Sequence, residues 1–312
     1  MQTFRGLLFG VSSRIFPKTG VDNRSLQGLY PKTSRFLVFI RTTWPAPLPP
    51  LPTLMSTAER YRLYADLLSE QPLPAAVLDL DLLDANNRAL QQRAAPKALR
   101  LASKSIRAPY ILERVLNSSP QWQGLMTYRA TEAAWLHHQF GFQDFLMGYP
   151  EVEPAALRML AELNAAGAQA VAMVDLPEHL ERAHAAAREV GAVLPVCMDL
   201  DCSMPLPGLW FGVRRSRLRT PQQVLAFARK IADYPQLKLV GLMGYEAQIA
   251  GLGDRMPGQG AKNVVVRLLQ GRSRRELARR RTAVLELLER EGFLLELVNG
   301  GGTGSLESTG QE

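Results

Sequence analysis

The sequence predicts an α/β protein whose parallel sheet takes the form of a TIM-like (β/α)8 barrel. From residue 72 onward, short apolar runs alternate with amphipathic helical segments. Proline begins three of those helical segments, at a position where its missing N–H costs little. Apolar strands that alternate with helices belong to a parallel sheet that is buried on both faces. A doubly wound open sheet is the structural alternative.

Eight apolar runs are the expected strands, and eight is the number that closes a TIM barrel. In chain order they cover residues 75–80, 98–102, 124–128, 144–149, 170–174, 194–200, 237–245 and 294–298. The clearest helices between them cover residues 154–166, 177–190, 221–232 and 272–291. In such a barrel, functional residues collect at the carboxyl ends of the strands.

The head of the chain, residues 1–54, differs from the rest. It holds seven lysine and arginine residues and one aspartate, and residues 45–52 are rich in proline, which favours an extended chain. At Met55 the sequence turns into a capped helix start, Ser-Thr-Ala-Glu. We expect residues 1–54 to be a basic, disordered or non-native extension and residues 55–312 to be the folded domain. An organellar transit peptide is the alternative for the head.

Composition excludes several classes of protein. With 46% hydrophobic and 21% charged residues the chain is neither disordered nor collagen-like. Two cysteines cannot form a disulfide framework, so a reducing, cytoplasmic location is expected. No apolar run approaches the roughly 18 residues of a membrane span. Outside the basic head the charges nearly balance, so neither a nucleic acid nor a membrane is an expected partner.

Lys104 directly follows the expected strand 98–102, which leads it into the mouth of the barrel. Burying a lysine charge is costly, and burial can turn the amine into a Schiff-base former. After the last expected strand comes Asn-Gly-Gly-Gly-Thr-Gly-Ser, residues 299–305, which could bind a phosphate through N–H groups and hydroxyls. A solvated lysine and a tight turn are the simpler readings of each feature alone. Together they indicate pyridoxal phosphate (PLP), held by Lys104 and the glycine-rich turn.

Five segments in order resemble the alanine-racemase-like, fold-type III PLP enzymes. They are Leu-Pro-Ala-Ala-Val-Leu-Asp-Leu-Asp at 73–81, Leu-Arg-Leu-Ala-Ser-Lys-Ser at 99–105, Gly-Leu-Met-Thr-Tyr at 124–128, Gly-Tyr-Glu-Ala-Gln at 244–248 and Val-Asn-Gly-Gly-Gly-Thr at 298–303. Within the family they look most like the D-threonine aldolase and D-serine dehydratase branch, also called amino acid deaminase/aldolase. The resemblance implies the α/β barrel of the alanine racemase N-terminal type.

The resemblance also assigns roles to single residues. Lys104 would carry PLP as a Schiff base and then act as the base at the substrate Cα. The phosphate would lie on the turn formed by Gly301, Gly302 and Thr303, with Ser305 as a further candidate. 

Three other side chains are candidates for the pocket. Tyr245 would line the cofactor or substrate site. Tyr128 is a candidate for the pocket wall and Arg214 for an anion contact. Arg214 lies among other arginines, so a solvated basic loop is its alternative reading.

The implied function is a PLP-dependent lyase that acts on D-amino acids with a β-hydroxyl, by dehydration with deamination or by retro-aldol cleavage. A racemase, a non-catalytic PLP-binding protein and an inactive truncated fragment are the alternatives. A small amino acid is the expected partner, and a homodimer is left open.

Two features depart from the family. Its members continue beyond the glycine-rich turn into a last strand and a C-terminal β-domain, so the barrel is expected to be incomplete here. In the family layout the run 75–80 precedes the barrel, which leaves seven barrel strands. The branch also uses a divalent metal whose ligands lie in that C-terminal part, so no metal ligands are expected in this chain. Asp199 and Asp201 are read equally as polar groups of the barrel mouth or as structural hydrogen-bonding residues.

Overall fold

The computed structural model describes residues 55–69, 71–253 and 256–312. The expected extension, residues 1–54, lies outside the described residues. The chain divides into a first unit that ends at Leu83 and a second unit, Asp84–Glu312. The strands and all predicted site residues belong to the second unit.

In the described part of the first unit, helix α2 covers Thr57–Leu68. Ser56 and Glu59 form a capping box, in which the Glu59 N–H donates to Ser56 Oγ at 3.2 Å and the Ser56 N–H donates to Glu59 Oε2 at 2.7 Å. Because two free N–H groups of the first turn are satisfied in this way, the helix begins where the sequence predicts.

The prediction of a strand at residues 75–80 is wrong. Residues 75–79 have no regular structure, and helix α3 begins at Leu80 and runs through Leu80–Ala94. The Asp79 carboxylate accepts the backbone N–H of Leu82 at 3.0 Å and also binds Arg60 at 2.9 Å. An apolar run becomes a strand only beside another strand, whereas Asp79 caps the first turn of a helix. The alternative that seven barrel strands remain is confirmed.

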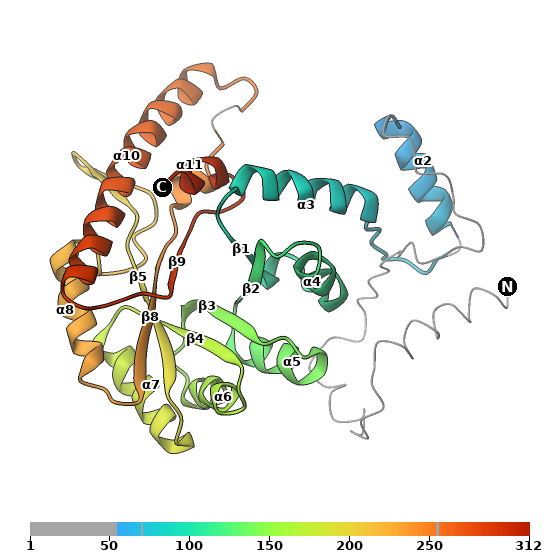
Figure 1. The fold of residues 1–312 in the computed structure, drawn as a ribbon. Helices are drawn as coiled ribbons and strands as arrows, with labels where there is room; N and C mark the ends of the chain where they lie inside the picture. The colour runs from blue at the N-terminus through green and yellow to red at the C-terminus, as the bar shows by residue number, and fades with distance from the viewer. Residues whose placement is uncertain (1–54, 70, 254–255) are drawn as a thin grey trace, which may run out of the picture. The chain divides into compact units, whose positions relative to one another are not determined.

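The second unit is built on a parallel sheet of seven strands that curls into a half-barrel (Figure 1). Its strands follow the chain in the order β1-β2-β3-β4-β5-β8-β9. They are β1 Leu99–Ala102, β2 Trp122–Thr127, β3 Asp144–Pro150, β4 Gln169–Val174, β5 Leu194–Asp199, β8 Leu237–Gly244 and β9 Leu297–Gly300. Each of the last seven expected strands is present. A small antiparallel hairpin, β6 Met204–Leu206 with β7 Leu209–Phe211, was not expected.

Helices cover the outside of the curved sheet (Figure 1). They are α4 Pro109–Leu116, α5 Ala130–Phe140, α6 Pro154–Ala165, α7 Pro177–Val190, α8 Pro221–Ala232 and α10 Gly260–Arg290, with the short α9 Ala247–Ala250 and α11 Leu306–Gly310 at the mouth. Proline opens α6, α7 and α8 as predicted. Helix α10 begins earlier than residue 272, because Gln270 donates to the carbonyl of Gln248 at 3.1 Å and fixes the added turns.

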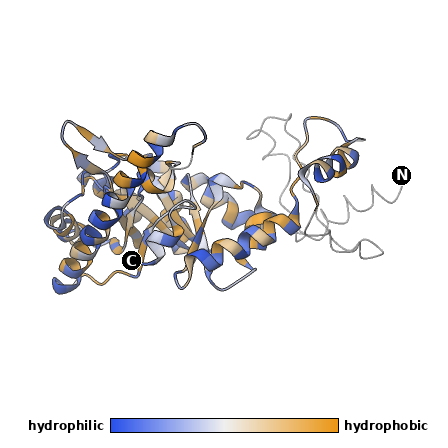
Figure 2. Ribbon diagram, turned by 90° about the horizontal axis from the view of Figure 1, so that it is seen from above, coloured by the Kyte–Doolittle hydropathy of each residue, from blue (hydrophilic) through white to orange (hydrophobic). Residues whose placement is uncertain are grey.

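The core of the second unit lies between the sheet and these helices. Leu125, Phe145 and Val196 on the strands are fully buried, as are Leu160 and Leu180 on the helices. Hydrophobic colour gathers in the strands, and hydrophilic colour marks the outer helix faces (Figure 2). This burial holds the sheet rigid, so the residues at the carboxyl ends of its strands have defined positions.

Candidate functional site

Lys104 lies in a single 3₁₀ turn, Ser103–Ser105, immediately after β1. The buried Ser103 hydroxyl holds this turn by donating to Glu132 Oε1 at 2.9 Å, and the other oxygen of Glu132 accepts the N–H of Tyr128 at 2.9 Å. With its neighbour fixed, Lys104 extends into solvent and donates from Nζ to Tyr149 Oη at 2.9 Å. Lys104 is therefore an accessible amine held in a defined direction.

Two tyrosines form an aromatic wall beside this amine. Tyr149 at the end of β3 and Tyr128 after β2 meet edge to face, with ring centroids 5.4 Å apart. Both rings are partly exposed, and Lys104 Nζ lies 5.1 Å from the Tyr149 ring centre. The structure thus places the predicted Tyr128 near Lys104 through Tyr149. Sequence reasoning missed Tyr149, although its place in Gly-Tyr-Pro at a strand end was a usable signal.

A buried ion pair also lies beside Tyr149. The Arg215 guanidinium is 5.1 Å from the Tyr149 ring centre, and its Nε donates to Asp199 Oδ2 at 2.8 Å. A terminal nitrogen of Arg215 also donates to the carbonyl of Gly148 at 2.8 Å. Asp199 is 1% exposed, and burial raises its pKa to about 6 even though Arg215 acts to lower it. Asp199 Oδ1 is buried without a hydrogen-bond partner.

The predicted Arg214 contacts Trp210 and not Tyr149. It is exposed, and its guanidinium stacks 4.3 Å from the ring centre of Trp210 on the β6–β7 hairpin. Its sequence neighbour Arg215 is the residue at the aromatic wall. Four arginines crowd this stretch, so the sequence offered no signal that separates the two.

The glycine-rich loop after β9 is fixed from its buried side. Gly301 has φ of 78°, which favours glycine, and its N–H donates to Glu246 Oε2 at 3.1 Å. The Gly302 N–H donates to Ser305 Oγ at 3.0 Å, and Ser305 Oγ donates to Glu246 Oε1 at 3.1 Å. Thr303 is exposed at the tip of the loop, and its carbonyl accepts Arg93 at 2.9 Å.

Tyr245 follows β8 and packs on this loop. A Cβ at Gly302 would lie 3.3 Å from Cε2 of Tyr245 and 3.1 Å from Cβ of Ala250. The loop can approach α9 and Tyr245 so closely because Gly302 has no side chain. The structure therefore brings the predicted Tyr245 and Gly302 together.

Glu246 is the center of the contacts that hold the loop, and sequence reasoning missed this role. It is 1% exposed, and Arg281 on α10 binds its Oε2 at 2.6 Å. The Thr309 hydroxyl donates to Oε1 at 2.5 Å. Its place directly after a strand was a signal, but nothing in the arginine-rich α10 sequence singles out Arg281.

The remaining candidates have structural partners. Asp201 accepts the N–H and hydroxyl of Ser203, both at 3.0 Å, and pairs with Arg219 at 3.2 Å. Cys197 and Cys202 are free and buried. In residues 55–69, 71–253 and 256–312, no group of three or more His, Cys, Asp or Glu side chains is arranged to hold a metal. Across those residues no helix has the length and apolar character of a membrane span.

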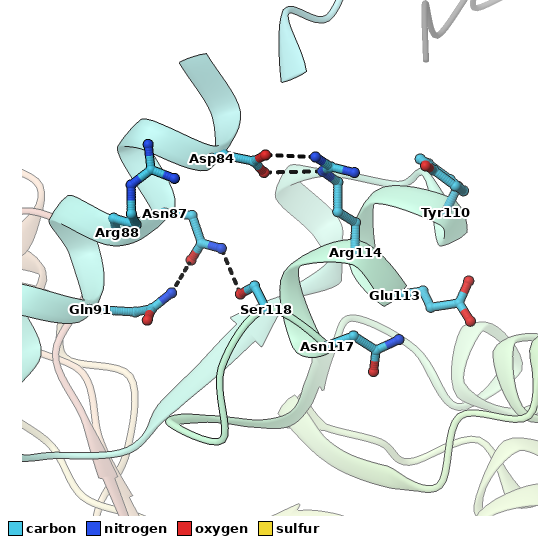
Figure 3. A pocket seen from close by; sticks show the side chains of 9 residues that line it. All are labelled: Asp84, Asn87, Arg88, Gln91, Tyr110, Glu113, Arg114, Asn117 and Ser118. Atoms are coloured by element: carbon cyan, nitrogen blue, oxygen red, sulfur yellow. Dashed lines mark hydrogen bonds and ion pairs between the residues drawn. The ribbon is translucent and has the colours of Figure 1, made fainter. Parts of the chain in front are cut away.

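A separate groove of about 530 Å³ lies between α3 and α4. Figure 3 shows it lined by polar side chains and crossed by a two-point ion pair from Arg114 to Asp84, at 3.0 and 2.6 Å. None of the residues predicted for the site lines this groove. Lys104 and the glycine-rich loop lie instead at the carboxyl ends of the strands.

Sequence comparison finds relatives with named activities. The 3-hydroxy-D-aspartate aldolase of Paracoccus denitrificans (strain Pd 1222) is 28% identical over 242 residues, which are 76% of this chain and 56% of that protein. The D-threonine aldolase of an Arthrobacter species is 28% identical over 244 residues, 78% of this chain and 58% of that protein. The chain thus spans little more than half the length of these relatives.

Structure comparison finds the same fold. The D-threonine aldolase from Filomicrobium marinum matches with a TM-score of 0.60 at 20% identity, covering 78% of this chain and 60% of that one. The D-threo-3-hydroxyaspartate dehydratase from Delftia sp. HT23 matches with a TM-score of 0.60 at 20% identity, covering 78% and 58%. The family model described as alanine racemase, N-terminal domain, matches residues 78–304. The chain therefore belongs to the alanine racemase N-terminal domain family of fold-type III PLP enzymes.

Proposed function

We propose that this chain is the PLP-binding part of a lyase that acts on D-amino acids with a β-hydroxyl. The observation that carries the proposal is the Lys104 amine, which is exposed and donates to Tyr149 Oη at 2.9 Å at the carboxyl end of β1. The names of the two curated relatives, both aldolases, support a substrate of this class. They favour retro-aldol cleavage over dehydration as the first reaction to test.

The described residues fit PLP at both of its ends. Lys104 provides an exposed amine for the aldehyde, next to an aromatic wall. The loop provides a backbone without side chains at Gly301 and Gly302 and the exposed Thr303 for the phosphate. The N–H groups of Gly301 and Gly302 already have internal acceptors, so we assign the phosphate chiefly to Thr303 and the tip of the loop.

The chain's own residues divide the work as follows. PLP, when bound, supplies an electron sink for negative charge at the substrate Cα. Lys104 attaches the cofactor and moves a proton at Cα. Tyr149 orients the Lys104 amine, Tyr128 packs against Tyr149, and Tyr245 supports the loop. Arg214, which stacks on Trp210, stays a candidate for an anion contact at the edge of the site.

We also infer the partners and place of action. The ligand is a small amino acid, and residues 55–312 are its binding domain. The free thiols of Cys197 and Cys202 support a reducing, cytoplasmic location.

The first experiment is borohydride trapping of PLP on the purified chain. We expect an absorbance band near about 420 nm with added PLP, and covalent label after reduction, in the wild type. Lys104→Ala should lose the label, whereas Lys97→Ala, an exposed lysine just before β1, should keep it. Equal labelling of Lys104→Ala would contradict the proposal. Glycine and an aldehyde released from D-threonine would then distinguish cleavage from dehydration, which releases a keto acid and ammonia.

A further inference from the structure

We propose that Asp199 is a positioning residue for Lys104, acting through Arg215 and Tyr149. The inference rests on the proposed function, because it concerns how the PLP-binding amine is held. It assigns a task to a buried carboxylate that the proposed chemistry does not itself use.

A continuous chain of contacts joins the two residues across the mouth of the half-barrel. Asp199 Oδ2 accepts Arg215 Nε at 2.8 Å, and Arg215 lies 5.1 Å from the ring centre of Tyr149. Tyr149 Oη accepts Lys104 Nζ at 2.9 Å. Asp199 ends β5, Tyr149 lies near the end of β3 and Lys104 follows β1, so the contacts span five neighbouring strands. Lys104 and Arg215 thus both contact the Tyr149 side chain.

Folding alone does not explain Asp199. A buried carboxylate is tolerated when its oxygens are paired, yet Oδ1 of Asp199 has no hydrogen-bond partner. Asp201, two residues later, is also buried, but both of its carboxylate oxygens have partners. Ser203 donates to both oxygens, and Arg219 pairs with one of them. What Asp199 does provide is a fixed anion for Arg215, which the Gly148 carbonyl holds from the other side at 2.8 Å.

The arrangement determines where the amine points. Arg215 keeps its place beside the Tyr149 ring only while Asp199 and Gly148 hold both ends of the guanidinium. A fixed ring fixes Oη, and Oη fixes the direction of Lys104 Nζ. Loss of the Asp199 charge replaces a charge-assisted hydrogen bond by a weaker one, so Arg215 and then Tyr149 gain freedom.

The network should respond to pH near the titration of Asp199. Burial raises its pKa to about 6, Arg215 opposes this, and Asp175 and Asp201 add to it. The Cys197 thiol on β5 is also close enough to interact electrostatically. Protonation of Asp199 below about pH 6 therefore weakens the hold on Arg215 and on the amine beyond it.

The test is the rate of borohydride-trapped PLP attachment from pH 5 to pH 8 in the full chain. Asp199→Asn should slow attachment about threefold to tenfold at pH 7.5, a loss on the scale of one charged hydrogen bond. The ratio of wild-type to Asp199→Asn rates should fall towards one as the pH drops through about 6. Taking the ratio cancels the pH dependence common to both proteins. Asp201→Asn is the matched control and should keep the wild-type rate at pH 7.5. Because the Asp201 charge adds to the raised pKa of Asp199, this variant should move the pH profile only towards lower pH.

A second variant guards against a folding defect. Tyr149→Phe changes a partly exposed residue, keeps the ring and removes the hydroxyl, so it should slow attachment to a similar extent. Adding Asp199→Asn to it should cause little further slowing, because both act through the same contact. Additive effects, an unchanged Asp199→Asn, or an equal loss in Asp201→Asn would overturn the inference. Absence of trapping in the wild type would instead overturn the proposed function, and the inference with it.

Discussion

Two buried carboxylate–arginine pairs stand at the carboxyl ends of the strands, and they differ in how fully they are satisfied. Glu246 binds Arg281 and also accepts the Gly301 N–H and the hydroxyls of Ser305 and Thr309. Asp199 binds Arg215 through one oxygen and leaves the other without a partner. Glu246 therefore serves as an anchor for the glycine-rich loop. Asp199 retains a charge that costs stability, which suits a group that holds a functional side chain in place.

The largest expected effect comes from breaking the Glu246 pair. Glu246→Ala should lower the free energy of unfolding by about 3–5 kcal/mol, because the buried Arg281 charge loses the more deeply buried of its two carboxylate partners. Three other donors, the Gly301 N–H and the hydroxyls of Ser305 and Thr309, also lose this acceptor. Urea unfolding followed by circular dichroism would measure the change. A loss below about 1 kcal/mol would mean that Glu312, which Arg281 contacts at 2.6 Å, is by itself a sufficient partner for the Arg281 charge.

The next largest effect is the pH dependence of stability that Asp199 causes. Folding raises the pKa of Asp199 from 3.8 to about 6, so the folded chain binds this proton more tightly than the unfolded chain does. Its contribution to stability is therefore greatest below about pH 4 and falls as the pH rises to about 6. The full change is about 3 kcal/mol, from roughly two pKa units. Urea unfolding should be measured from pH 4 to pH 7. Over this range the free energy of unfolding of the wild type should fall by about 3 kcal/mol more than that of Asp199→Asn. Parallel curves would contradict it.

The smallest effect is expected at an exposed ion pair, which serves as a control for the two buried pairs. Arg93 and Glu307 form an ion pair at 2.9 Å beside the same loop, but the Glu307 side chain is 68% exposed. Glu307→Gln should change the free energy of unfolding by no more than about 0.5 kcal/mol, since solvent screens exposed pairs. The same urea measurement applies. A loss comparable to that of Glu246→Ala would show that burial is not what distinguishes the Glu246 pair.

Much of the fold was predictable because strands and helices leave local patterns. Seven apolar runs became the seven parallel strands, and the prolines at 154, 177 and 221 mark true helix starts. The run 75–80 failed because the pattern of a strand does not reveal whether a partner strand is present. The β6–β7 hairpin escaped notice because strands of three residues are too short to show an alternating pattern.

The site divides in the same way. Lys104, Tyr245 and the glycine-rich loop could be chosen from sequence, because residues after apolar strands gather at one edge of a parallel sheet. Tyr149, Asp199 and Glu246 occupy equivalent places, but nothing local indicates which of them meet. Asp201 looks like Asp199 in sequence and has quite different partners.

By itself, the sequence determined the seven parallel strands in their order, the helix starts at Pro154, Pro177 and Pro221, and the family, because each is encoded by neighbouring residues. Only the tertiary structure decided that Arg215 rather than Arg214 meets Tyr149, and that Arg281 among the arginines of α10 binds Glu246. Successive side chains of an extended segment point to opposite sides, and those of a helix are turned around its axis. Which side is buried therefore depends on strands that lie far apart in the chain.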